Sequence, residues 1–78
     1  MNTAMLKAVM VQYGDTQEIL AQALGMAQSA LNARINGKID FRKKEIQFIR
    51  NRYHLTCEMT DLIFFTDEVS KSDTNSEN

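Results

Sequence analysis

The polar side chains of residues 28–36 are of a kind that can hydrogen-bond to the edges of DNA bases. If this segment is helical, the face opposite Leu31 and Ile35 spans about 140° and carries no charge. It consists of Gln28, Ser29, Asn32, Ala33 and Asn36. Amides both donate and accept, and a Gln or Asn can form two hydrogen bonds with an adenine in the major groove. We therefore expect this face to contact bases.

The residues before this segment predict a shorter helix followed by a tight turn. Apolar residues at three- and four-residue spacing form one stripe over residues 17–24, namely Ile19, Leu20, Ala23 and Leu24. Gly25 can take a positive φ without a steric penalty, so it ends this helix, and Gly37 ends the next one in the same way. Met26 is expected in the core, and the small Ala21 allows a close helix approach. This pattern favours a DNA-binding helix-turn-helix over an ordinary helical hairpin.

At these positions the chain resembles a known family. The spacing of Ala21, Gly25, Leu31 and Ile35, with the run GMAQSALNARING, is similar to the helix-turn-helix of Cro and repressor proteins from temperate phages. The resemblance implies a lambda-repressor-like fold in which Gln28, Ser29, Asn32 and Ala33 contact bases. It also implies a Cro-like regulator that represses transcription by occupying an operator. The run EIQFIRNRYHLTCEMTDLIFFTDEV is similar to short regulators from prophages of Gram-positive bacteria.

Two positions depart from the family pattern. Ala33 stands where a basic side chain often lies, which removes a contact to guanine. Ala27 stands where many relatives place a Ser or Thr that caps the recognition helix.

The whole chain is predicted to be all-α, with about five short helices. It has no proline, only three glycines and no alternating run of β-branched residues. A first helix over residues 4–13 should bury Leu6, Val9, Met10 and Tyr13. A fourth helix should bury Ile46, Ile49 and Tyr53, and a fifth, over residues 56–65, should bury Met59, Leu62 and Ile63. We expect one domain over residues 1–65 and a polar, disordered tail over residues 66–78.

Capping residues delimit these helices, with alternatives at three of them. Asn2 or Thr3 can cap the first helix, and Thr56 the fifth. The second helix can begin with an Asp15 to Glu18 capping box or with Thr16 as the cap. The fourth can begin after Arg42, with Phe41 packed on Ile46, or one turn earlier after Asp40.

Positive charge is concentrated in the middle third of the chain, although the net charge is −1. Residues 28–54 hold seven Lys and Arg against two acids, whereas residues 55–78 hold one against six. We expect the residues in and after the polar helix to contact phosphates: Arg34, Asn36, Lys38, Arg42, Lys43 and Lys44. For Arg34, a neighbouring acid is the alternative partner. Arg50 and Arg52 are equally compatible with DNA contact and with pairing to acids.

No catalytic or metal-binding arrangement stands out, and we expect neither an enzyme nor a cofactor. Cys57 is the single cysteine and is interpreted as a small buried hydrophobe. His54 is the single histidine, at a predicted helix end. No apolar run approaches the roughly 20 residues of a membrane helix, so a cytoplasmic protein is expected. We also expect no small-molecule ligand.

The expected partners are an operator in double-stranded DNA and a second copy of the chain. Residues 62–65 are too continuously apolar for one buried face of a short helix. We therefore expect a dimer through residues 57–69, with Ile63, Phe64 and Phe65 at the interface. The alternative function is a protein-interaction module of the same fold, which uses exposed Phe64 and Phe65 to modulate a partner phage repressor.

Overall fold

The computed structural model describes residues 1–66, and these form five α-helices and no strand. The helices are α1 (Thr3–Gln12), α2 (Gln17–Leu24), α3 (Gln28–Ile35), α4 (Lys43–Arg52) and α5 (Cys57–Phe64). This confirms the all-α prediction and the number of helices. The tail predicted from residue 66 lies, apart from Thr66, outside the described residues.

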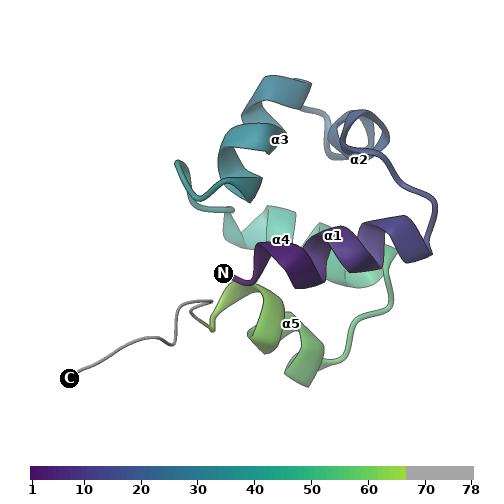
Figure 1. The fold of residues 1–78 in the computed structure, drawn as a ribbon, viewed down its shortest axis with the longest axis vertical. Helices are drawn as coiled ribbons and strands as arrows, with labels where there is room; N and C mark the ends of the chain where they lie inside the picture. Colours follow the sequence, from purple (N-terminus) through teal and green to yellow (C-terminus); the bar gives the residue numbers. More distant parts are fainter. Residues whose placement is uncertain (67–78) are drawn as a thin grey trace.

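The core lies where all five helices meet. Figure 1 shows α2 and α3 together at one end of the molecule, α1 and α4 across the middle, and α5 at the other end. Six side chains are completely buried, at least one from each helix: Leu6, Leu20, Leu31, Ile35, Ile49 and Ile63. A 2.7 Å hydrogen bond from the Asn2 amide to the Ile63 carbonyl joins the start of α1 to α5. Both ends of the described chain are therefore held against the same core.

Side-chain caps begin three of the helices. Asn2, Thr16 and Thr56 accept hydrogen bonds from the backbone amides of Met5, Ile19 and Met59, at 3.0 to 3.1 Å. These contacts agree with the predicted caps and decide for Thr16 over the box that begins at Asp15. At α4, Arg42 is the cap position and its amide donates to Oε1 of Glu45 at 2.8 Å. The start after Arg42 is therefore the correct alternative.

Several apolar residues are more exposed than their spacing predicts. Ile19 on α2 is 42% exposed, and Leu62 on α5 is 39% exposed. In these two helices, α2 and α5, a smaller side chain occupies the inner face instead, Ala21 in α2 and Thr60 in α5. Tyr13, predicted to be buried, is 46% exposed because its ring lies at the rim of the core while its hydroxyl donates to the Tyr53 carbonyl at 3.0 Å.

None of the helices in residues 1–66 has the length and apolar character needed to cross a lipid bilayer.

Candidate nucleic-acid interface

The turn between α2 and α3 depends on Gly25. Its φ of 75° and ψ of 30° are left-handed, a conformation that costs other residues about 1–2 kcal/mol. The Gly25 amide donates to the Gln22 carbonyl at 3.1 Å, and the Met26 amide to the Ala21 carbonyl at 3.0 Å. This pair of bonds is a Schellman motif, which satisfies the last carbonyls of α2 and turns the chain into α3. The predicted stop at Gly25 is confirmed.

Helix α3 has the two faces that its sequence predicts. Leu31 and Ile35 are completely buried, whereas Gln28, Ser29 and Asn32 are exposed, as is Asn36 just after the helix. Ala33 is half-buried at the edge of this outer face. Ala27 at the cap position makes no side-chain hydrogen bond, so the amides of the first turn of α3 have no side-chain partner. The outer face of α3 is thus an exposed, uncharged row of hydrogen-bonding groups.

One hydrogen bond orders this outer face. The Asn36 side-chain amide donates to Oδ1 of Asn32 at 3.1 Å, one helical turn away. This bond takes up one of the two lone pairs of the Asn32 oxygen, so the second lone pair and the NH₂ group remain as hydrogen-bonding groups on the exposed face.

At its C-terminal end α3 is fixed by a residue that sequence reasoning did not single out. The Thr3 hydroxyl donates to the Ile35 carbonyl at 2.9 Å, across 32 residues. The bond satisfies a carbonyl at the helix end that has no partner within the helix. No local sequence pattern indicates this contact, since Thr3 was considered only as a cap of α1.

The Arg34 guanidinium forms its hydrogen bonds within the protein. Its Nε and Nη2 donate to the two carboxylate oxygens of Glu45 at 2.9 and 3.3 Å, and its Nη1 to the Ala30 carbonyl at 3.1 Å. The two side chains are only 12% and 15% exposed. Pairing with a neighbouring acid is therefore the correct alternative for Arg34, and the predicted phosphate contact does not fit its position. The ion pair holds α3 against the start of α4.

The pKa of Glu45 reflects these contacts. Burial raises the pKa of this carboxyl, but the hydrogen bonds from Arg34 and from the Arg42 amide outweigh it, so the net pKa lies below the usual value. Glu45 is thus a carboxylate at neutral pH, and it stabilises the cap of α4 and the guanidinium of α3 together.

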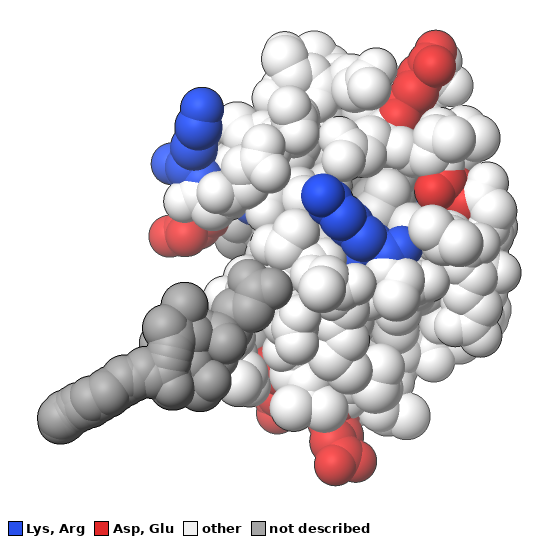
Figure 2. Space-filling view, in the orientation of Figure 1, with Lys and Arg blue, Asp and Glu red and all other residues white. Residues whose placement is uncertain are grey.

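Four basic side chains follow α3 and remain exposed, namely Lys38, Arg42, Lys43 and Lys44. None of them forms an ion pair within the described residues. They lie in the loop that Gly37 opens with a φ of 80° and in the first turn of α4. In the view of Figure 2, the surface over α2 and α3 is mostly uncharged, with the charges around its edges. The outer face of α3 is thus neutral, and the exposed cations lie in the loop and first helical turn that follow it along the chain.

The basic residues late in α4 point elsewhere. Arg52 Nε donates to Oδ2 of Asp15 at 2.7 Å, so the acid-paired alternative is correct for Arg52. Arg50 Nη2 lies 3.1 Å from Sγ of Cys57. Cys57 is exposed, which corrects the prediction of a buried cysteine. It is the first residue of α5, where Thr60, one turn later, takes the inner position.

The predicted dimer residues separate into three environments. Ile63 is completely buried in the core, so its prediction as an interface residue is wrong. Phe64 is partly buried and packs its ring edge to face with Phe41, at 5.4 Å between centroids. Phe65 is 68% exposed.

No group of three or more metal-ligating side chains occurs in residues 1–66.

Comparison with protein-family models, with curated proteins and with solved structures gives no match.

Proposed function

We propose that the protein is a sequence-specific DNA-binding regulator that places α3 in the major groove of duplex DNA. The observation that carries the proposal is the outer face of α3, where Gln28, Ser29 and Asn32 are exposed while Leu31 and Ile35 anchor the opposite face in the core. The major groove admits an α-helix, and base edges there are distinguished by hydrogen-bond donors and acceptors. An exposed row of amides and a hydroxyl suits that task.

The chemistry of each position suggests what it contacts. Both the oxygen and the NH₂ of the Gln28 side-chain amide are available, which suits two hydrogen bonds to adenine. Asn32 accepts a hydrogen bond from Asn36 and keeps its NH₂ group, which can donate to an acceptor on a base edge. Ala33 can offer only its methyl group, which suits the methyl of thymine.

Phosphate contacts come from the exposed cations that follow α3. Lys38, Arg42 and Lys44 have no acid partner within residues 1–66 and lie on the loop and first turn beyond the recognition helix. Such contacts supply most of the affinity and fix the orientation of the protein, but they carry no sequence information. Lys43 and Asn36 lie in the same stretch, and we propose them as further phosphate contacts.

A regulator of this size acts as a dimer. One recognition helix of eight residues contacts only a few base pairs, and two copies one helical turn apart give the specificity that a genome requires. The similarity of GMAQSALNARING to Cro and repressor proteins supports a phage or prophage repressor that blocks a promoter by occupying its operator.

A second candidate is a protein-interaction module that modulates a partner repressor. The observation that favours it is Phe65, a large apolar side chain that is 68% exposed.

A mobility-shift assay with the DNA that flanks the gene, at two salt concentrations, separates the two candidates. We expect a discrete complex that survives excess random competitor and weakens steeply with salt. Binding that random competitor removes completely, or no binding at low salt, would contradict the proposal and favour the interaction module.

A further inference from the structure

The first residues of the chain connect three helices through hydrogen bonds. The Asn2 amide donates to the Ile63 carbonyl of α5 at 2.7 Å, and Oδ1 of Asn2 accepts from the Met5 amide at the start of α1. The next residue, Thr3, donates from its hydroxyl to the Ile35 carbonyl of α3 at 2.9 Å. Because Asn2 is held by both α5 and α1, the position from which Thr3 reaches α3 is also fixed.

Two polar contacts hold the last turn of α3 against the rest of the protein. Arg34 reaches Glu45 on α4 through two long side chains, whose many rotamers can follow a small movement of the helix. The Thr3 bond ends on the α3 backbone itself. Packing of Leu31 and Ile35 keeps the helix on the core, but apolar burial is non-directional. The Thr3 hydroxyl is therefore the contact that fixes the orientation of the last turn.

The peptide group that Thr3 binds also holds Asn32. Its carbonyl belongs to Ile35 and accepts from Thr3, and its N–H belongs to Asn36 and donates to the Asn32 carbonyl at 2.9 Å. The Asn36 side chain donates to Oδ1 of Asn32 at 3.1 Å. Thr3 is thus connected to both the backbone and the side chain of Asn32 through one peptide group and the residue that follows it.

We infer that Thr3 is a positioning residue for base recognition by Asn32. With the hydroxyl in place, the Asn32 amide keeps the orientation that a directional hydrogen bond to a base edge requires. Gln28, the first residue of α3, is oriented by the Gly25 turn instead. Loss of the hydroxyl therefore weakens the contact of Asn32 and spares that of Gln28. The inference rests on the proposed function, because it concerns how α3 recognises bases.

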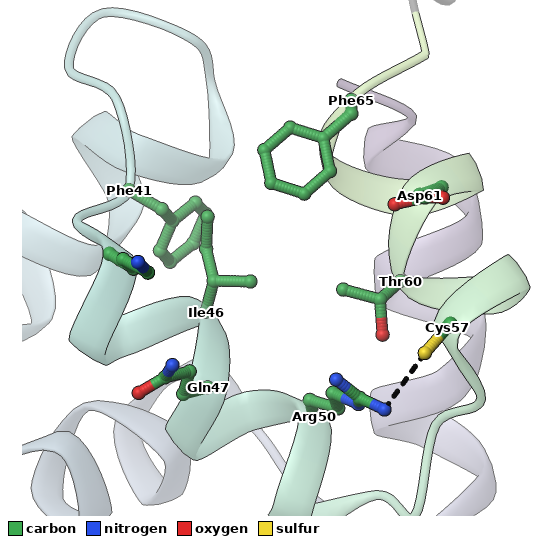
Figure 3. A pocket seen from close by; sticks show the side chains of 9 residues that line it. Phe41, Ile46, Gln47, Arg50, Cys57, Thr60, Asp61 and Phe65 are labelled. Carbon is green, nitrogen blue, oxygen red and sulfur yellow. Dashed lines mark hydrogen bonds between the residues drawn. The ribbon is translucent and has the colours of Figure 1, made fainter.

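Three variants separate positioning from stability. Thr3→Val removes the hydroxyl with little change of shape, and Thr3→Ser keeps a hydroxyl. Thr60→Val is the matched control, since the Thr60 hydroxyl donates to the Thr56 carbonyl at 2.8 Å, within the start of α5. Thr60 lines the groove between α4 and α5 (Figure 3), and α5 lies at the opposite end of the molecule from α3 (Figure 1). Circular dichroism and urea unfolding check that each variant is folded.

Amide hydrogen exchange tests the connection without DNA. In Thr3→Val the Asn36 amide should exchange about fivefold faster than in the parent, because the last turn opens more often. The Leu31 amide, which donates to the Ala27 carbonyl at the start of α3, should keep its rate. Thr3→Ser and Thr60→Val should match the parent at both amides. An unchanged rate at Asn36, or an equal rise at Leu31, would overturn the inference.

A double-mutant cycle tests the consequence for recognition, on a duplex motif that the parent chain selects from a random library and on shuffled duplex. Thr3→Val should bind the motif about tenfold more weakly and shuffled duplex as before, whereas Thr3→Ser and Thr60→Val should match the parent on both. The loss should nearly vanish in an Asn32→Ala background and persist in full in a Gln28→Ala background. A merely structural effect would reduce the folded fraction and lower binding to both duplexes by the same factor.

The outcomes distinguish this inference from the proposed function. A motif bound equally well by Thr3→Val and the parent, an equal loss on both duplexes, or a loss that persists in full in the Asn32→Ala background overturns the inference alone. A parent chain that selects no motif overturns the proposed function, and with it any role of Thr3 in recognition. The exchange rates decide separately whether Thr3 fixes the last turn of α3.

Discussion

The Tyr53 hydroxyl donates a 2.6 Å hydrogen bond to Oδ2 of Asp15, and so joins the end of α4 to the loop between α1 and α2. The same carboxylate accepts two hydrogen bonds from Arg52, at 2.7 and 3.1 Å. The Tyr13 ring lies 5.1 Å from the Tyr53 ring. This cluster fixes the loop that leads into α2, and α2 in turn packs against the proposed recognition helix.

Asp15→Asn should therefore destabilise the fold by about 2 kcal/mol at pH 7, because it removes hydrogen bonds to a charged group. The hydrogen bond from Arg52 lowers the pKa of Asp15, and the Tyr53 hydroxyl lowers it further, against the opposing effect of burial. Because the folded-state pKa of Asp15 is lowered from its usual value of 3.8, the stability that Asp15 contributes is complete well above pH 3.8. This stability is lost as the pH falls through the folded-state pKa.

Urea unfolding of Asp15→Asn and the parent at pH 7 and in acid measures this contribution. The difference in unfolding free energy should shrink in acid. Asp40→Asn, which changes an exposed acid in the α3–α4 loop, serves as the control and should lie within about 0.5 kcal/mol of the parent. A difference for Asp15→Asn that is the same at both pH values would show that the carboxylate charge does not stabilise the fold.

Arg34→Met should destabilise the protein by about 2–3 kcal/mol, because it leaves the largely buried Glu45 carboxylate without its charged partner. Since the guanidinium is engaged within the protein, the salt dependence of DNA binding by the folded variant should match the parent. Thermal unfolding and binding titrations measure the two effects. An unchanged stability together with a shallower salt dependence would place Arg34 on a phosphate instead.

Replacing Lys38 and Lys44 by Gln should weaken binding to all DNA sequences alike. If both lysines contact phosphates, the slope of log affinity against log salt becomes shallower by up to about two units. Lys7→Gln, an exposed lysine on α1, is the matched control and should leave the slope unchanged. Fluorescence anisotropy at several salt concentrations gives the slopes, and an unchanged slope for the double variant would exclude these lysines from the interface.

Local signals in the sequence predicted the elements that depend on local chemistry. Gly25 ends α2 because a left-handed residue is needed there, and Leu31 and Ile35 are buried because they share one face of α3. Contacts between distant residues were not predictable in the same way. The Thr3 bond to the Ile35 carbonyl spans 32 residues and the Arg52 bond to Asp15 spans 37, and each depends on how the helices pack.

Burial was hardest to predict in the short helices. Ile19 lies on the expected stripe of α2, but packing against α3 favours the small Ala21, and Ile19 is left half-exposed. For the same reason the continuous apolar run at the end of α5 divides unequally, with Ile63 buried, Phe64 against Phe41, and Phe65 at the surface. A hydrophobic residue in the sequence shows that burial is favourable, but the neighbouring helix decides which residue is buried.

Selection from a random duplex library tests the central claim that the outer face of α3 recognises sequence. The parent chain should enrich a defined motif and bind it at least about a thousandfold more tightly than shuffled duplex. Gln28→Ala and Asn32→Ala should each lose about 1–3 kcal/mol on that motif, with shuffled duplex bound as before, while Gln12→Ala on α1 matches the parent. A parent chain that enriches no motif, or variants at positions 28 and 32 that lose equally on motif and shuffled duplex, would contradict the account.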